Sequence, residues 1–295
     1  MKRAGLPCSV LNVQPEAPSS DAYISISGGM DLLKELFRHV YNDWTLSVHT
    51  NGHNVKSWLT SLVCGCTAQF GPGGMLTLHS GMLPDYLRGG SAWRRTLARF
   101  TCVMYDRIIC VNTEIADELA SLGIPRRQLE IKPAFLPVHG GTISIPQQMD
   151  TWMKRHTPVI STTLFFRPEY GFELLMDAVS ILRRRHPALG CLVMGGGDDA
   201  AAARQAVNER GLAETVLLAG DVDHELCLAL LSCSTVFVRP TFRDGDSISV
   251  REAMSLGIPV VASNVGTRPE GTLLFKAGDV NALVEQIAKS LCLRN

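Results

Sequence analysis

Short apolar runs alternate with longer amphipathic stretches along most of the chain, a pattern typical of parallel strands joined by crossover helices. In the first half, the apolar runs predict strands at residues 23–27, 45–49, 75–79 and 107–112. One helix is predicted by an apolar stripe made of Leu32, Leu33, Leu36, Phe37 and Val40. A second apolar stripe consists of Trp93, Leu97, Phe100 and Met104, and it leaves Arg94, Arg95 and Arg99 on the opposite face.

The alternation is clearer in the second half. It predicts strands at residues 159–165, 191–194, 216–219, 235–238 and 259–262, and helices at 172–185, 200–210, 225–231, 248–256 and from 280 onward. This succession is typical of a doubly wound α/β domain. Between the halves, the composition changes to glycines, prolines and a Gln-Gln pair. We therefore predict a first domain at 1–140, a linker at 141–157 and a second domain at 158–295, with a cleft between the domains.

The overall charge and the cysteines exclude several classes of protein. Lys and Arg number 28, as do Asp and Glu, so the chain lacks the positive field that binding to nucleic acid requires. The nine cysteines are odd in number, lie mostly in apolar runs and lack zinc-site spacing, which predicts reduced thiols, no metal site and a cytoplasmic location. No apolar run approaches the roughly 18 residues of a membrane span. Contact with the inner face of a membrane remains an open alternative.

A glycine turn follows the strand predicted at 191–194. Gly195, Gly197 and Ala200 satisfy the dinucleotide fingerprint G-x-G-x-x-A. That fingerprint belongs on the first strand of its domain, whereas this strand is the second, so an NAD site is the least favoured interpretation. A tight turn with a structural role and a turn that a ligand approaches closely are both compatible with the sequence.

Residues 239–254 are the most informative stretch, because a strand is followed there by an acidic loop and then by a helix. Asp246 or Ser247 is placed to cap the helix, and its first amides would suit a diphosphate. Glu252 lies one to two turns further, where a carboxylate accepts hydrogen bonds from vicinal hydroxyls such as those of a ribose. Asp244 would meet a second polyol. The alternative is a surface turn with a capped helix and no ligand.

This stretch resembles the family-four, or group 1, retaining glycosyltransferases of the GT-B fold. The family's two acidic residues with seven positions between them, followed by Ala-Met and Gly-x-Pro-Val, are matched by Asp244, Glu252, Ala253, Met254, Gly257, Pro259 and Val260. The resemblance covers about residues 40–290 and is most specific from Val159 onward. It implies an α/β fold of two Rossmann-like, doubly wound domains facing a cleft.

The resemblance also implies roles for individual residues. Asp244 would lie by the donor sugar and Glu252 would hold the nucleotide ribose. His79, at a predicted strand end, would be the catalytic histidine, whereas His49 and His53 are weaker candidates. The donor-binding residues would be Arg167, Gly196, Gly245, Asp246, Ser247, Ile248, Ser249 and Glu252. No metal or cofactor is expected, because protein groups would stabilise the leaving diphosphate.

The chain departs from the family at several positions. Asp244 stands where Glu is usual, and Tyr170 stands where a phosphate-binding Lys precedes a glycine. Arg167, with Arg239 or Arg243, would then supply the positive charge. The first domain is shorter than in the family and the last crossing helix is missing, so we expect an abbreviated first domain and a chain truncated at both ends.

The predicted function is retaining transfer of a sugar from a nucleotide-diphosphate sugar to a hydroxyl of a saccharide or lipid-linked acceptor, as in polysaccharide biosynthesis. Two alternatives remain open besides this one. The first alternative is a non-catalytic nucleotide-sugar binding subunit that depends on a partner protein. The second is an NAD-dependent enzyme that uses the glycine turn. A peripheral membrane contact and a partner subunit are therefore kept as expected partners, and nucleic acid is not.

Overall fold

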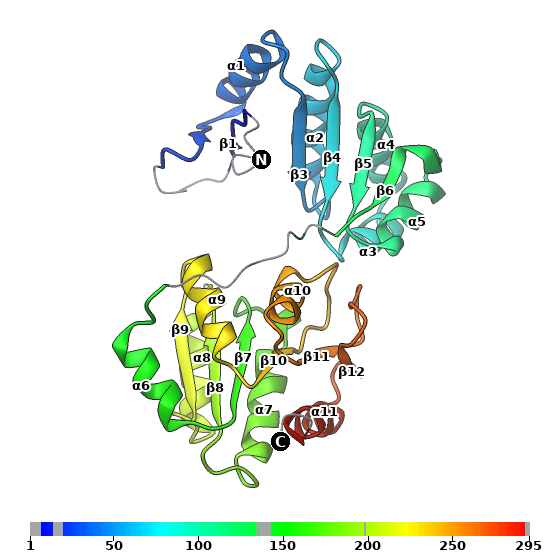
Figure 1. The fold of residues 1–295 in the computed structure, drawn as a ribbon. Coiled ribbons are helices and arrows are strands. Elements are labelled where there is room, and N and C mark those ends of the chain that lie inside the picture. The colour runs from blue at the N-terminus through cyan, green and yellow to red at the C-terminus, as the bar shows by residue number, and fades with distance from the viewer. Residues whose placement is uncertain (1–6, 14–19, 134, 136–142, 198, 293–295) are drawn as a thin grey trace. The chain divides into compact units, whose positions relative to one another are not determined.

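The computed structural model describes residues 7–13, 20–133, 135, 143–197 and 199–292. The chain forms two compact units, Met1–Lys132 and Pro133–Asn295, which are coloured blue to green and green to red in Figure 1. The division lies earlier in the chain than the expected boundary at 140. Most of the expected linker is the helix α6 (Gln147–Arg155), whose Met153 is buried in the core of the second unit; residues 141 and 142 lie outside the described residues.

The first unit is built on a parallel four-stranded sheet in the order β3-β4-β5-β6. The strand expected at 23–27 is reduced to the two residues of β2, which form a separate parallel pair with β1. The bounds in chain order are β1 Leu11–Asn12, β2 Ile24–Ser25, α1 Gly29–Val40, β3 Leu46–Thr50, α2 Val55–Ala68, β4 Gly74–Leu78, α3 Leu83–Arg88, α4 Ala92–Cys102, β5 Arg107–Cys110, α5 Thr113–Ser121 and β6 Leu129–Ile131. Because the strands follow one another in one direction, β3 is an edge strand of this sheet.

Helix α4 buries a different face from the one predicted. Trp93 and Phe100 of the expected apolar stripe are 52% and 53% exposed, and the helix buries Ala98, Thr101 and Cys102 instead. The small side chains explain the difference, because they let α4 pack closely against α2. Gly65 of α2 lies against the turn that follows α4, where a Cβ atom would be 2.8 Å from the Met104 side chain.

The second unit is a parallel six-stranded sheet in the order β12-β11-β10-β7-β8-β9. Its elements are β7 Val159–Thr163, α7 Phe172–Leu182, β8 Gly190–Met194, α8 Ala200–Glu209, β9 Val216–Gly220, α9 His224–Ser232, β10 Val236–Arg239, α10 Ile248–Ser255, β11 Val260–Ser263, β12 Leu273–Phe275 and α11 Val280–Cys292. This is the 3-2-1-4-5-6 strand order of the doubly wound fold. The order reverses between β7 and β10, so the loops that follow these strands flank the point where such sheets bind ligands.

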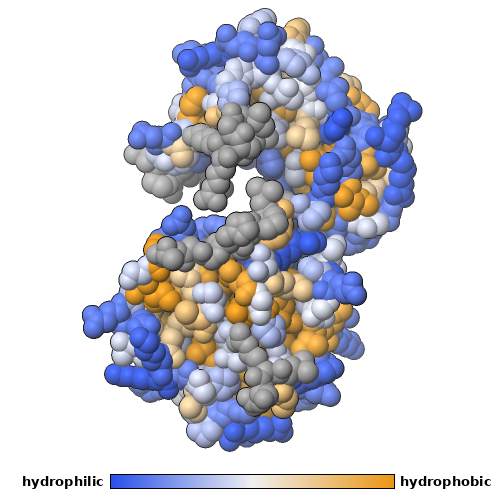
Figure 2. All heavy atoms as spheres, in the orientation of Figure 1, coloured by the Kyte–Doolittle hydropathy of each residue, from blue (hydrophilic) through white to orange (hydrophobic). Residues whose placement is uncertain are grey.

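Two buried clusters lie on opposite faces of this sheet. Alternate strand residues such as Val193 and Val238 pack with α7, α8 and α11, whereas Leu192 and Phe237 pack with α9 and α10. Strands buried on both faces read as continuous apolar runs, which is the pattern seen in the sequence. The outline of each unit is mainly hydrophilic, and apolar residues gather over the middle of the second unit in Figure 2. The expected α/β class with parallel sheets is confirmed.

Candidate functional site

The start of α10 presents backbone amides without a side-chain cap. Ser247 holds the N-cap position, but among the described residues no side chain caps the helix, and its hydroxyl lies 3.1 Å from that of Ser249. The Asp246 carboxylate accepts hydrogen bonds of 2.7 and 2.9 Å from the Arg251 guanidinium, and its side chain is 1% exposed. The expected cap by Asp246 or Ser247 is therefore wrong. The amides of the first turn remain available to an anion.

Asp244 is held in a buried ionic network. Its Oδ2 atom accepts hydrogen bonds of 3.0 Å from Arg239 and from Arg268, and one of 3.3 Å from Thr241. Burial opposes ionisation, but the two guanidinium groups prevail and hold the pKa of Asp244 below its ordinary value. The carboxylate is charged and committed to protein partners. In this structure the carboxylate binds two arginine side chains. Its contact with a donor sugar stays a prediction.

Glu252 is paired with a residue that the sequence analysis did not single out. His224 begins α9, and its Nε2 atom lies 2.6 Å from Oε1 of Glu252 on α10. The Glu252 side chain is 8% exposed and that of His224 is 63% exposed. His224 contacts Oε1 of this carboxylate. A ligand that approaches from solvent would therefore bind through Oε2.

Arg239 lies close to Tyr170, the residue that replaces the family's lysine. The Arg239 guanidinium lies 5.2 Å from the centre of the Tyr170 ring and donates a 2.8 Å hydrogen bond to the carbonyl of Thr163, the last residue of β7. It thereby places a positive charge at the switch point between β7 and β10. Arg167 is exposed on the loop after β7, over the Phe165 ring at 6.0 Å. The structure therefore places one guanidinium at the end of β10 and a second on the loop after β7.

The glycine turn after β8 is needed for close backbone packing. Gly195 has a φ of 124°, and a Cβ atom there would lie 2.0 Å from the carbonyl oxygen of Leu164. Gly196 has no such neighbour within 3.5 Å, since its nearest atom would be 3.7 Å away. A cavity of about 580 Å³ opens beside the turn and is lined by Phe166, Gly195, Gly196, Ala200, Arg204, Leu218, Ala219, Gly220 and Asp221. The turn therefore has a structural role and also borders a cavity.

The loop after β11 closes over the acidic loop after β10. Thr267 donates a 2.7 Å hydrogen bond to the carbonyl of Gly245, and a Cβ atom on Gly266 would lie 2.5 Å from the same carbonyl. This contact carries Arg268 to Asp244. Arg268, like His224, was not among the residues predicted from the sequence. A signal was present for Arg268, because Gly266–Glu270 has the Gly-x-x-x-Glu spacing of a segment in the group 1 glycosyltransferases that the chain resembles, whereas nothing in the sequence marked His224.

The expected catalytic histidine lies in the first unit, while the other site residues lie in the second. His79 follows β4, and its Nε2 atom is 3.0 Å from Nδ1 of His49 at the end of β3. The rings stack with centres 5.3 Å apart. Burial lowers the pKa of both imidazoles, and the neighbouring His49 lowers that of His79 further. Both rings are therefore neutral near pH 7. His53 is not part of this pair, and its Nδ1 atom lies 3.0 Å from the hydroxyl of Ser80.

The match to a known protein family lies in the second unit. Residues 153–292 match the family model of the glycosyl transferases group 1. A GDP-mannose-dependent alpha-(1-6)-phosphatidylinositol monomannoside mannosyltransferase of Mycolicibacterium smegmatis is 30% identical over 130 residues, which are 42% of this chain and 34% of that protein. A phosphatidyl-myo-inositol mannosyltransferase of Propionibacterium freudenreichii is 28% identical over 164 residues, 54% of this chain and 39% of that protein. The chain thus spans little more than a third of these relatives.

The fold is shared with solved glycosyltransferases of the GT-B class. HepE of Anabaena, solved in complex with UDP, superposes with a TM-score of 0.70 at 14% identity, over 92% of this chain and 76% of HepE. Within the described residues no group of three or more His, Cys, Asp or Glu side chains is arranged to hold a metal ion. In the same part of the chain, no helix has both the length and the apolar character that crossing a membrane requires.

Proposed function

Through residues 153–292 the chain belongs to the glycosyl transferases group 1 family, and from this premise we propose that it transfers a sugar from a nucleotide-diphosphate sugar to a hydroxyl acceptor. The observation that carries the proposal is the start of α10 at the switch point of the sheet. Uncapped amides at Ser247–Ser249 would receive the diphosphate, and Glu252, one turn further, would hold the ribose hydroxyls.

The leaving group of such a transfer is the nucleotide diphosphate, whose negative charge grows as the glycosidic bond breaks. Preorganised donors and cations that face this charge lower the barrier. Arg167 is exposed, and Arg239 is held in place by Asp244 and Thr163, so the two would supply one exposed and one fixed guanidinium. Transfer would then need neither a metal nor a cofactor. Unchanged product formation in the presence of EDTA is the expected result, and loss of it would contradict this part of the proposal.

GDP-mannose is the first donor to test, because the two relatives are described as mannosyltransferases and one of them as GDP-mannose-dependent. A ligand that binds only the folded chain raises its unfolding temperature. We expect GDP and GDP-mannose to raise it and NAD to have no effect. A rise in unfolding temperature with UDP or ADP alone would be consistent with sugar transfer from a different nucleotide donor. A rise with NAD alone would contradict the proposal.

Retention of the anomeric configuration and a role for His79 complete the proposed mechanism. The departing phosphate would assist removal of the acceptor proton, so no protein nucleophile is required. The configuration of the product at the anomeric carbon, read by NMR, tests retention directly. His79→Ala should lower kcat far more than it weakens donor binding, and equal losses in both would argue against a local role.

The second candidate function is a nucleotide-sugar binding subunit that depends on a partner for catalysis. The engagement of Asp244 by two arginines favours it, since this carboxylate has no oxygen left without a protein partner to meet a sugar. The two candidates differ in one measurement. An enzyme releases GDP from GDP-mannose when a hydroxyl acceptor is added, and a binding subunit holds the donor without releasing GDP.

The acceptor and the membrane are proposed partners of the first unit. Trp93 and Phe100 are exposed on α4 together with the exposed Arg99, a combination of aromatic and cationic side chains that suits an anionic lipid surface. We propose a location at the cytoplasmic face of a membrane and an acceptor in polysaccharide or glycolipid synthesis. Sedimentation with vesicles containing an anionic lipid tests the contact, and it should decrease in a Trp93→Ala, Phe100→Ala variant.

A further inference from the structure

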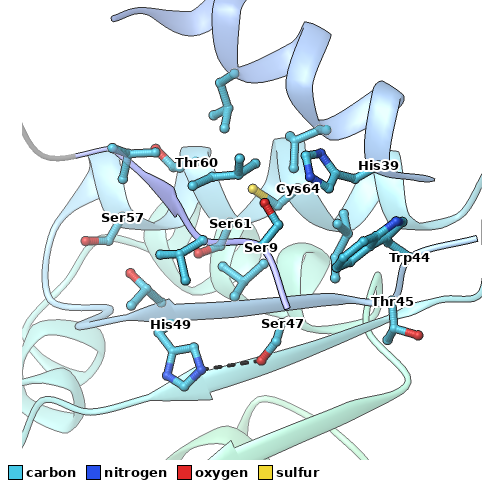
Figure 3. A pocket seen from close by; sticks show the side chains of 18 of the residues that line it. Ser9, His39, Trp44, Thr45, Ser47, His49, Ser57, Thr60, Ser61 and Cys64 are labelled. Carbon is cyan, nitrogen blue, oxygen red and sulfur yellow. Dashed lines mark hydrogen bonds between the residues drawn. The ribbon is translucent and has the colours of Figure 1, made fainter. Parts of the chain in front are cut away.

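A cavity of the first unit lies between two extended segments of the chain. It has a volume of about 670 Å³ and is bounded by residues 7–13 on one side and by β3 on the other (Figure 3). Its lining includes every residue from 44 to 50 and every residue from 7 to 11. Successive side chains of a strand point to opposite faces, so a cavity lined by consecutive residues runs along the edge of a strand and not over one face. The cavity is therefore a gap between two strand edges.

Backbone groups of β3 are directed into this gap. Among the described residues, β3 pairs only with β4. The Leu46 N–H and the Thr50 carbonyl form their hydrogen bonds with the residues that flank β4. Alternate residues of a parallel strand direct their backbone groups to opposite sides, so the N–H and carbonyl groups of Ser47 and His49 lie on the side of the gap.

The opposite wall shows the same alternation. The carbonyls of Val10 and Asn12 accept hydrogen bonds of 2.8 and 2.9 Å from β2 and from the residue that follows it. The backbone groups of Leu11, between them, are therefore directed to the other side of β1, toward the gap. Within the described part of the chain, no backbone hydrogen bond joins β1 to β3. An occupant with a backbone of its own would pair with both edges.

Both strand edges rest on the same layer of helices. Leu11 of β1 and Val48 of β3 pack against one buried cluster, to which α1 contributes Leu36 and α2 contributes Cys64. Away from the gap, β1 pairs with β2 and β3 pairs with β4. The order β2-β1-gap-β3-β4 is that of a single sheet from which one strand is missing.

The walls of the gap indicate which side chains an inserted strand would carry. A side chain directed toward the helices meets the buried Leu36 and Cys64 and should be apolar. A side chain directed to the opposite face lies beside Ser47 and His49, which are exposed and point away from Cys64 in Figure 3, and it should be polar. No Asp or Glu is among the lining residues, and Lys56 is their one Lys or Arg. Charge complementarity therefore favours an acidic strand over a basic one.

The described strands of a second copy of this chain do not meet these requirements. Each of them already has a neighbour on at least one edge. The gap takes a strand whose two edges are both free, because it is flanked by β1 and by β3. The occupant is therefore a segment that belongs to no sheet before it binds.

We propose that the gap between β1 and β3 binds an extended, acidic segment of a partner protein in which apolar and polar side chains alternate. The five residues of β3 span roughly 17 Å, so about five residues of the segment are held. The segment joins the β1-β2 pair to the four-stranded sheet by pairing with both. This inference goes beyond the proposed function, because it holds equally for a transferase and for a binding subunit.

The test uses the peptide acetyl-Glu-Val-Thr-Val-Thr-Val-Glu-amide as its probe, and calorimetry on the full chain measures the affinity. A control peptide with the same residues in the order Glu-Val-Val-Val-Thr-Thr-Glu lacks the alternation and should bind at least tenfold more weakly. N-methylation of the three valine amides keeps every side chain and removes the donors of one edge, so it should also weaken binding at least tenfold. Absence of binding for the alternating peptide, or equal affinity for it and either control, would overturn the proposal.

Amide hydrogen exchange locates the bound peptide. At saturation, exchange of the Leu11, Ser47 and His49 amides should slow at least tenfold. The amides of β6, at the other edge of the same sheet, are the control and should not change. Protection of β6 equal to that of β3 would mean that the peptide adds to any open edge, and would overturn the proposal.

Two variants of Ser47 form a matched pair. Ser47→Pro removes the N–H that faces the gap and leaves the bonds of its neighbours to β4, a change that edge strands tolerate. It should weaken peptide binding at least tenfold, whereas Ser47→Ala keeps the N–H and should bind like the wild type. If Ser47→Pro does not unfold cooperatively, Thr60→Trp at the lining replaces it, with the exposed Leu59→Trp as its control. Equal affinity within the pair used would overturn the proposal.

Sedimentation equilibrium of the chain alone tests for a second copy as the occupant. Ser47→Pro should leave the measured mass unchanged, and a dimer that this variant dissociates would overturn the proposal of a partner segment. Titration with GDP separates the inference from the proposed function. Peptide binding without GDP binding would contradict the transferase proposal alone, and GDP binding without peptide binding would contradict the strand site alone.

Discussion

The imidazole of His224 and the carboxylate of Glu252 lie 2.6 Å apart, Nε2 to Oε1, and join the first turn of α9 to the middle of α10. The two residues are 28 positions apart in the chain, and each sits on a helix that follows a strand of the central sheet. Glu252 is the residue to which the family resemblance gives the ribose. The orientation of that carboxylate therefore depends on a histidine from another element.

Replacing His224 should affect both stability and ligand binding. In His224→Ala the nearly buried Glu252 carboxylate loses its partner, which should lower the free energy of unfolding by about 1 kcal/mol and weaken GDP binding several-fold. His224→Gln should restore part of the affinity, because its amide also donates a hydrogen bond. Glu225→Gln, on the next residue of α9, is the control. The assignment fails if His224→Ala and the control bind GDP alike in calorimetric titration.

Removing Arg268 should destabilise the second unit strongly. Its side chain is 4% exposed and donates to Asp244, so Arg268→Ala leaves a buried carboxylate with one guanidinium instead of two. Breaking a buried ion pair from one side costs about 3–5 kcal/mol. Urea unfolding measures this loss, and Arg185→Ala at an exposed position gives the comparison. A loss no larger than in Arg185→Ala would mean that the network contributes little to the fold.

The two neighbouring glycines of the turn after β8 should respond differently to alanine. Gly195→Ala forces a positive φ and a 2.0 Å contact with the Leu164 carbonyl, so the β7 and β8 ends must separate. We expect a loss of about 1–3 kcal/mol in unfolding free energy. Gly196→Ala meets no close atom and should retain stability. If Gly196→Ala nevertheless weakens nucleotide binding, the ligand approaches the turn as the family resemblance implies.

Most of the second unit could be predicted from the sequence, and the reason is its burial on both faces of the sheet. Five of its six strands and all of the later helices lie within a few residues of the predicted ranges. Strand β12 has only three residues, too few to show a pattern, and it was missed. Amphipathic stripes were less informative in the first unit, where α4 buries Ala98 and Cys102 because small side chains allow a closer helix contact.

Site residues that are close together in the sequence could be predicted, whereas their partners from distant parts of the chain could not. The loop and helix from Asp244 to Glu252 were recognised because their spacing is local. Arg268 and His224 reach these two carboxylates from other loops and helices, at separations of 24 and 28 positions. Such partners depend on how strand ends meet in space. A single sequence does not contain that information in its spacing.

The first unit should lose stability as the pH falls below neutrality. Burial lowers the pKa of His49 and His79 relative to their ordinary value of about 6.5, so the folded chain binds fewer protons than the unfolded chain below that pH. Stability from the neutral pair is present above about pH 6.5 and is lost below it. Unfolding temperatures between pH 8 and pH 5 measure this loss. A His49→Gln, His79→Gln variant should show a flatter dependence, and an equally steep one would exclude the pair as its source.

The proposed function requires a nucleoside diphosphate to bind at the start of α10, and a calorimetric titration of the full chain with GDP, UDP and ADP measures that binding. One of the three should bind, and Glu252→Gln should weaken that binding about tenfold to a hundredfold, the range expected for lost hydrogen bonds to a charged group. Glu225→Gln should bind like the wild type. Absence of binding for all three nucleotides, in a chain that unfolds cooperatively, would contradict the proposed function, and equal affinity in wild type and Glu252→Gln would contradict the site at α10.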